Sequence, residues 1–518
     1  MSQARWALTT LGEVADLYQG FGFPKALQGK SSGDLAFYKV SDISRAVLAG
    51  RETLGDAVHY ISSVEAQKLR ATPIPKDSVV FARIGEAINL NRRAVLPAPS
   101  LVDNNVIGVK ARSGVEDRYL FYFLKTIKLG ELSQATTVPA VRTSDIERIA
   151  FPLAPTSEQR RIVSRLDELL SRIEEGERAL ERVQKLVERY RQSVLKAAVT
   201  GELTRDWREK TQGQLESGES LLGRLLNARR EAWEKAELDK LKAKGITPAN
   251  DKWKQKYEEP TRPDTTELPE LPEGWAWASL EQIAAPEGNA ITDGPFGSNL
   301  KTEHYTDSGP RVIRLQNIKD GRFADERAHI SHERFDQLQK HRVFAGDLLM
   351  AALGESLPRV CIAPDDLGPA IVKADCIRFK PSSQISAQCL TAFLNSPPAR
   401  HRTKATIHGV GRPRLNLDEI RSLVVPVPSV EEQRAITDAI AIQTSTFEHL
   451  RLDAERGLTQ LKRLRQSILA QAFNGELVPQ HATDEPAMVL LEHIAAKCTV
   501  DSAIKPKRGR KSKSEETA

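Results

Sequence analysis

Residues 191–203 read RQSVLKAAVTGEL, and residues 465–477, which lie 274 positions later, read RQSILAQAFNGEL. The same offset aligns further segments without a gap: Ile146 with Ile420, Pro152 with Pro426, and Glu158-Gln159-Arg160 with Glu432-Gln433-Arg434. An ungapped match of this kind indicates an internal duplication.

Each copy predicts one long helix. Proline-punctuated extended segments come first, FPLAP at 151–155 and VPVPS at 425–429. Thr156 with Gln159, and Ser429 with Glu432, then have the spacing of a capping box, and Gly201 or Gly475 suits a C-cap.

Apolar residues within each copy recur at alternating spacings of three and four, which is typical of a coiled-coil seam. The first seam contains Ile162, Leu166, Leu169, Ile173, Gly176, Leu180, Val183, Val187, Tyr190, Val194 and Ala197. The second contains Ile436, Ile440, Phe447, Leu450, Leu461, Leu464 and Ile468, and is weaker at Gln443 and Gly457. One such stripe would suit a helix buried in its own domain. Two matched stripes, separated by more than 200 residues, favour a two-helix rod with a domain near each end.

The segments that precede the helices are also repeated, more loosely. WALTTLGEV at 6–14 matches WAWASLEQI at 275–283, and YKVSDI at 38–43 matches IRLQNI at 313–318. Short β-branched runs between Gly, Pro and Asp turns predict two mixed domains, so the fold class is α+β with pseudo-two-fold internal symmetry. The predicted division is a first domain at 1–150, a helix at 151–203, a linker with a charged helix at 204–270, a second domain at 271–424, a helix at 425–480 and a basic disordered tail at 481–518.

Composition is that of an ordinary globular protein of 518 residues, 40% hydrophobic and 28% charged, with a net charge of +6. Residues 505–518 hold six basic and two acidic side chains, so the remaining body is nearly neutral. No run approaches the ~20 apolar residues of a membrane span, which favours a cytoplasmic protein. Cys361, Cys376, Cys389 and Cys498 lack the spacing of a zinc site and are expected to be reduced.

Two segments look like parts of a methyltransferase. Tyr18–Gly22 fits a Y-x-G-x-G loop for S-adenosylmethionine, and Ser396–Ala399 is similar to an S-P-P-Y/F motif. They fall in different repeat units, and Ala399 lacks the aromatic ring that stacks on a flipped base. We therefore expect no catalytic residues, no metal site and no cofactor bound by this chain.

Polar, glycine-rich loops remain, and their side chains suit contact with nucleic acid, because Arg, Asn and Gln can form paired hydrogen bonds with base edges. For any single residue, an ordinary surface position is the competing interpretation. The candidates are Lys25, Lys30, Lys39, Ser41, Arg83, Arg92, Arg93 and Arg142 in the first unit, and Ser298, Asn299, Lys301, Arg314, Gln316, Asn317, Arg412 and Arg414 in the second.

The chain to about residue 480 resembles the DNA specificity subunit of type I restriction-modification systems. The motifs that carry this resemblance are DGPFGSNL with VIRLQNI, the P-x-P segment followed by an EEQR helix start, and the G-E-L helix ends. The resemblance implies two target-recognition domains, each of which reads half of a bipartite double-stranded DNA site, held apart by an antiparallel coiled coil of the two long helices. It also implies a non-catalytic role in phage defence, with two modification subunits and two restriction subunits as partners.

In such complexes S-adenosylmethionine, ATP and Mg are expected on the partner subunits. Docking of the partners is expected on the two long helices, at Gln159, Arg160, Tyr190, Gln192, Gln433, Arg434 and Gln466. The rival interpretation is an autonomous architectural or regulatory DNA-binding protein without methyltransferase partners.

Overall fold

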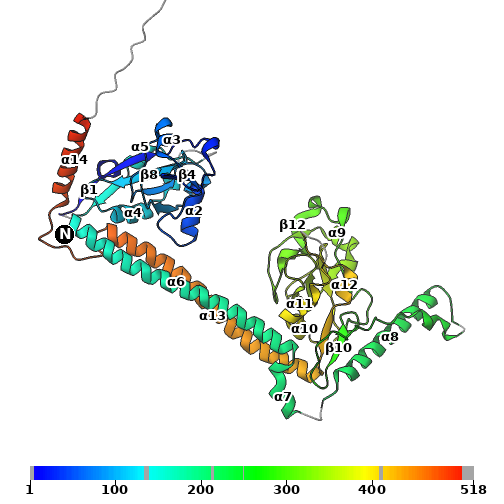
Figure 1. Ribbon diagram of the computed structural model, residues 1–518. Coiled ribbons are helices and arrows are strands. Elements are labelled where there is room, and N and C mark those ends of the chain that lie inside the picture. The colour runs from blue at the N-terminus through cyan, green and yellow to red at the C-terminus, as the bar shows by residue number, and fades with distance from the viewer. Residues whose placement is uncertain (1–4, 133–138, 212–214, 249, 408–411, 505–518) are drawn as a thin grey trace, which may run out of the picture. The chain divides into compact units, whose positions relative to one another are not determined.

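The computed structural model describes residues 5–132, 139–211, 215–248, 250–407 and 412–504. The chain divides into two compact units, one made of residues 1–180 and 455–518 and the other of residues 181–454. Each unit contains one sheet domain and part of each of the two longest helices, α6 (Thr156–Val199) and α13 (Val430–Phe473) (Figure 1). The first unit is therefore assembled from both ends of the chain, whereas the second is one continuous segment.

The sheet domain of the first unit is built on a four-stranded antiparallel sheet in the order β2-β8-β5-β6. A second sheet has the order β4-β3-β7, with β3 parallel to β7, and β1 pairs with β9. The strands are β1 (Ala7–Thr10), β2 (Ala15–Gln19), β3 (Leu35–Tyr38), β4 (His59–Ile61), β5 (Val79–Ala82), β6 (Arg93–Val95), β7 (Leu101–Val102), β8 (Val106–Ala111) and β9 (Ala150–Leu153). The helices are α1 (Leu11–Val14), α2 (Val40–Leu48), α3 (Ser63–Lys68), α4 (Asp117–Thr126), α5 (Thr143–Glu147) and, after α13, α14 (Ala487–Ile504).

The sheet domain of the second unit repeats this topology. Its four-stranded sheet has the order β11-β20-β17-β18, its second sheet has the order β15-β12-β19-β16 with β12 parallel to β19, and β10 pairs with β21. The strands are β10 (Ala276–Ser279), β11 (Ile291–Thr292), β12 (Tyr305–Ile313), β13 (Ile318–Lys319), β14 (Arg322–Phe323), β15 (His329–Ile330), β16 (Arg342–Val343), β17 (Leu348–Ala351), β18 (Arg359–Ile362), β19 (Ala370–Val372), β20 (Cys376–Phe379) and β21 (Val424–Val427). The helices are α7 (Arg205–Lys210), α8 (Gly218–Ala243), α9 (His332–Gln337), α10 (Ala387–Leu394), α11 (Pro397–Thr403) and α12 (Leu417–Arg421). The predicted α+β class with two mixed domains is confirmed.

The central strands explain why each four-stranded sheet is covered on both faces. All four residues of β5, VVFA, and of β17, LLMA, are buried. In β5, Val79 and Phe81 belong to a core shared with α4 and α6, while Val80 belongs to a separate core that includes α2. Alternate side chains of a strand point to opposite faces, so a continuous apolar run packs against both layers.

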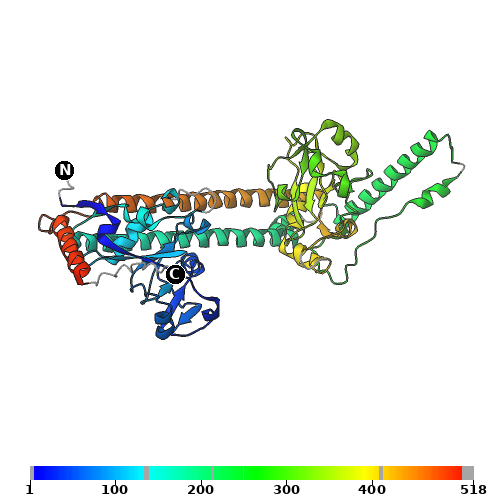
Figure 2. The ribbon, with the colours of Figure 1, turned by 90° about the horizontal axis from the view of Figure 1, so that it is seen from above.

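The long helices run side by side within each unit, in opposite directions (Figure 2). In the first unit, a Cβ added to Gly176 would lie 3.2 Å from Leu461, and one added to Gly457 would lie 2.8 Å from Leu180. In the second unit, Tyr190 contacts Phe447 edge-on with ring centroids 5.2 Å apart. The antiparallel pair is confirmed, but Gly457 does not weaken it as expected, because the missing side chain gives Leu180 its space.

For the two long helices, the predicted C-terminal caps agree with the structure better than the predicted N-terminal capping boxes do. Gly201 and Gly475 adopt φ angles of +75° and +76° just beyond α6 and α13, as predicted for C-caps. The first capping box is wrong, because Thr156 donates to the Gly114 carbonyl at 2.9 Å and Gln159 contacts other groups. In the second, Ser429 accepts from the Glu432 amide at 3.0 Å, but the Glu432 carboxylate lies elsewhere.

Two segments predicted as linker or tail contribute to the cores. The predicted 204–270 linker includes α8, whose Leu221 and Leu225 are buried in the core of the second unit. Helix α14 lies beside β1 and buries Ala487 and Ile494 in the first unit (Figure 1). The tail predicted from residue 481 is therefore shorter than expected, because an apolar helix face packs there, and residues 505–518 lie outside the described part of the chain.

Candidate nucleic-acid interface

Several loops meet at one edge of the four-stranded sheet in the first unit. Strands β2 and β5 both pair antiparallel with β8, so both end where β8 begins. The Gly20 amide donates to the Val106 carbonyl at 3.1 Å, and the Arg83 amide donates to the Asn105 carbonyl at 2.8 Å. A crossing segment joins them, because the Val141 amide donates to the Arg83 carbonyl at 2.9 Å. We call residues 20–34, 83–92, 103–105 and 139–142 the first loop edge.

The same arrangement recurs in the second unit. Strands β11 and β17 end where β20 begins. The Ala352 amide donates to the Asp375 carbonyl at 2.8 Å, and the Leu415 amide donates to the Ala352 carbonyl at 2.9 Å. We call residues 293–304, 352–358, 373–375 and 412–416 the second loop edge.

A glycine stands at the same place in each loop edge, and the two are separated by the repeat offset. A Cβ on Gly20 would lie 1.7 Å from the Asp103 carbonyl oxygen, and a Cβ on Gly294 would lie 2.1 Å from the Lys373 carbonyl carbon. No side chain fits at these distances. Each glycine therefore permits the crossing of two loops that shapes the edge.

The second loop edge presents an arginine held between an acid and an aromatic ring. Arg414 lies 2.8 Å from the Asp375 carboxylate, and its guanidinium lies 5.6 Å from the centre of the Phe296 ring. Phe296 is 45% exposed, so its ring is open to a ligand at this edge. Neither Asp375 nor Phe296 was a sequence-based candidate. The sequence signal for Phe296 was an aromatic residue in a glycine-rich loop, whereas the positive φ of +66° at Asp375 is seen only in the structure.

A capping turn after β3 and β12 places two further basic residues in equivalent positions. The Lys39 amide donates to the Asp42 carboxylate at 2.7 Å, and the Arg314 amide donates to the Asn317 side-chain oxygen at 2.8 Å. The Asn317 side chain is fully buried and donates to the Ala324 and Glu326 carbonyls. Asn317 thus shapes this turn and has no free group for a base.

The other predicted contact residues divide by exposure. Arg93 is buried, with a pKa lowered by burial to about 9, and it donates to the Asn91 side chain at 3.0 Å and to the Ile127 carbonyl. Burial thus removes Arg93, like Asn317, from any surface that could contact DNA. The exposed residues are Lys25, Lys30, Ser41, Arg142, Asn299, Lys301, Gln316, Arg412 and Arg414. The half-buried ones are Lys39, Arg83, Arg92 and Arg314, and the Ser298 side chain lies outside the described part of the structure.

Two of the predicted docking residues on the long helices are buried and form hydrogen bonds within the chain. Gln159 is buried, accepts from the Glu116 amide at 2.9 Å and donates to the Ala154 carbonyl at 2.8 Å. Gln433 is buried in the same way, accepting from the Ser386 amide at 2.7 Å and donating to the Pro428 carbonyl at 3.2 Å. We call these two residues the glutamine clamps, since each ties the start of α4 or α10 to the start of a long helix.

The remaining docking candidates lie nearer the surface. Arg160 pairs with Glu116 at 2.7 Å, and the half-buried Gln192 donates to Glu188 at 2.8 Å. Tyr190 is 55% exposed, and Arg434 and Gln466 are exposed as well.

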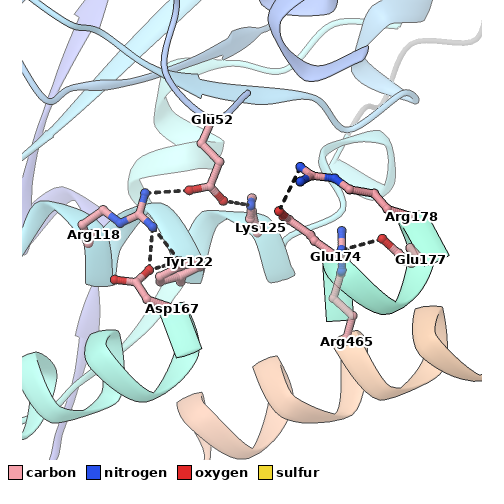
Figure 3. A network of polar contacts seen from close by, with 9 residues as sticks. All are labelled: Glu52, Arg118, Tyr122, Lys125, Asp167, Glu174, Glu177, Arg178 and Arg465. Atoms are coloured by element: carbon pink, nitrogen blue, oxygen red, sulfur yellow. Dashed lines mark hydrogen bonds and ion pairs between the residues drawn. The ribbon is translucent and has the colours of Figure 1, made fainter. Parts of the chain in front are cut away.

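An ion network missed by the sequence reasoning joins the first sheet domain to α6 (Figure 3). Glu52 accepts hydrogen bonds from Arg118 and Lys125, each at 2.6 Å, and Arg118 also donates to Asp167 of α6 at 2.6 Å. Burial favours the neutral form of Glu52, but the Lys125 and Arg118 cations outweigh burial, so the pKa of Glu52 is lowered. These partners are far apart in sequence, so no spacing pattern could have revealed them.

Other kinds of site receive little support from the described residues. Among them, no group of three or more His, Cys, Asp or Glu side chains is placed to hold a metal ion. Cys361, Cys376 and Cys389 are free and buried, and burial raises the pKa of the Cys361 and Cys376 thiols to about 12. No helix in the described ranges is long and apolar enough to cross a membrane.

Residues 4–182 match the family model of the type I restriction modification DNA specificity domain. The chain is 24% identical over 499 residues to the type I restriction enzyme EcoBI specificity subunit of Escherichia coli, covering 95% of this chain and 90% of that protein. It is 21% identical over 531 residues to the StySPI specificity subunit of Salmonella potsdam, covering 97% of each. A chain from a study of complex assembly and conformational transition of the type I R-M system shares the fold, with a TM-score of 0.60 and 17% identity over 91% of this chain and 98% of that one.

Proposed function

We propose that this chain is a DNA specificity subunit of a type I restriction-modification system and that it selects a bipartite DNA target. Each sheet domain contacts one half-site through its loop edge. The observation that supports this most directly is that the same loop edge is built twice, at the ends of β2 and β5 and at the ends of β11 and β17. Two related reading surfaces in one chain suit a target made of two half-sites.

The exposed side chains of the loop edges suit this role. Lys301 and Arg412 supply positive charge for phosphate contacts, which position a protein on the duplex. Arg142 and Arg414 offer guanidinium donors at the segment that crosses each edge. Gln316, on the capping turn after β12, offers an amide that can bond to adenine.

The chain acts as the non-catalytic reader of a larger complex in the cytoplasm. Two modification subunits carry S-adenosylmethionine, and two restriction subunits carry ATP and Mg. The nearly neutral body of the chain supports this division, because a reader with little net charge needs partners that neutralise phosphates. Tyr190, Arg434 and Gln466 are exposed positions of the long helices at which a partner can dock.

The test is a selection from random duplexes by the chain combined with its modification subunits, at fixed salt, together with a map of methylated adenines in cells. We expect two short fixed sequences separated by a gap of fixed length. A complex that enriches no sequence, or a single uninterrupted site, would contradict the proposal. Tight and specific binding by the chain alone, unchanged by the modification subunit, would favour an autonomous DNA-binding protein.

A further inference from the structure

Each loop edge contains an arginine in or next to an isolated β-bridge, but the two arginines stand on opposite partners of the paired segments. In the second edge, Arg414 forms the bridge with Leu353. In the first edge, Ala140 occupies that place and forms the bridge with Ile84. Ala140 and Arg414 are separated by the repeat offset of 274 residues, so they are equivalent in both sequence and pairing.

The backbone hydrogen bonds show which residue of the second edge is equivalent to Arg83. Arg83 accepts the amide hydrogen of Val141 at 2.9 Å, and Ala352 accepts that of Leu415 at 2.9 Å. The Arg83 amide donates to Asn105, just as the Ala352 amide donates to Asp375. The pair Arg83 and Ala140 in the first edge thus corresponds to Ala352 and Arg414 in the second, with arginine and alanine exchanged.

The Arg414 side chain is oriented by its surroundings. Its Nη2 lies 2.8 Å from the Asp375 carboxylate, and the Phe296 ring lies beside the guanidinium. Asp375 is itself held by the hydrogen bond from Ala352 to its carbonyl. With 48% of the Arg414 side chain exposed and Nη2 paired to Asp375, the planar guanidinium has further donors for a ligand.

The Arg83 side chain lies deeper in its edge. It is half-buried, and its Nε is buried without a hydrogen-bond partner among the described residues. A buried donor without a partner costs free energy, so a ligand whose acceptor reaches this Nε gains by satisfying it.

We propose that Arg414 and Arg83 each read one guanine, Arg414 in the half-site of the second domain and Arg83 in that of the first. This rests on the proposed function and adds the base and the residues that read it. The planar fork of arginine matches O6 and N7 of guanine in the major groove, which lysine cannot contact with the same geometry. Because Arg83 follows the central strand and Arg414 lies in the segment that crosses the edge, the two guanines occupy different positions within their half-sites.

The experiment compares the duplex selection of the wild-type complex with those of Arg414→Ala and Arg83→Ala. We expect Arg414→Ala to lose the preference for one G·C pair in one half-site by roughly 5- to 150-fold, the discrimination of one paired contact. Every other position should keep its preference, and Arg83→Ala should do the same in the other half-site. Arg421→Ala is the matched control, since Arg421 of α12 pairs with Asp418 at 3.1 Å away from the bridge.

Two further variants keep the test decisive if Arg414→Ala is poorly folded. Arg414→Lys keeps the charge without the fork and should relax the same base pair, and Asp375→Asn should weaken the preference there by a smaller factor. The inference is overturned if Arg414→Lys retains the full wild-type preference at every position, or if the position that relaxes is an A·T pair. Failure of the proposed function is different, because then the wild-type complex itself enriches no bipartite sequence.

Discussion

Replacing a glutamine clamp should release a sheet domain from its long helix. In Gln433→Ala, the Ser386 amide at the start of α10 loses its acceptor at 2.7 Å, and the Pro428 carbonyl loses its donor at 3.2 Å. Gln433 is 3% exposed, so water does not readily replace the lost side chain.

The size of the effect follows from the two groups left without partners. A buried donor or acceptor that loses its partner costs about 1–3 kcal/mol. Ser386 is only half-buried, which places its amide at the lower end. We therefore expect Gln433→Ala to lower the free energy of opening of this region by about 2–4 kcal/mol, equivalent to a roughly 30- to 900-fold change in the opening equilibrium.

Native-state hydrogen exchange of a peptide covering residues 386–394 measures this directly, since opening of α10 exposes its amides. Gln466→Ala is the control, because Gln466 is an exposed glutamine on the same helix and its loss should change exchange by less than tenfold. If the two variants exchange equally fast in this peptide, the clamp does not hold the second domain on α13.

Three other outcomes are expected. Gly294→Ala should abolish selection of the second half-site while leaving the first intact, because its Cβ would lie 2.1 Å from Lys373; Gly288→Ala, with nothing within 4 Å, should select normally. The stability difference between wild type and Glu52→Gln in denaturant titrations should be largest near neutral pH. Because the folded pKa of Glu52 is lowered, its contribution is present above the unfolded pKa of about 4.3 and should vanish as the pH falls through the folded pKa. Deleting residues 486–518 should destabilise the first unit in calorimetry, because Ala487 and Ile494 leave its core, whereas deleting residues 505–518 should not.

The repeat made the large features predictable. An offset of 274 residues located both long helices and both glycine C-caps, because these depend on local pattern and on duplication. The features that could not be predicted from the sequence depend on contacts between distant segments. Gln159 has the spacing of a capping residue, yet its side chain instead accepts a hydrogen bond from the amide of Glu116, which lies just before α4. Likewise, the sequence suggests that Arg93 is exposed and could contact a base. In the structure its guanidinium is buried and donates to the Ile127 carbonyl.

The assembly of the first unit from both ends of the chain has a consequence for how the protein is made. When residue 180 leaves the ribosome, Ile162 and Leu166 still lack the core partners Ile468 and Leu469 of α13. The whole of residues 181–454 must be synthesised before those partners begin to appear, which takes on the order of 14–55 s at about 5–20 residues per second. During that interval the nascent first unit carries uncovered apolar surface and is a natural client for chaperones, and any product truncated before α13 is complete exposes the same surface to proteases.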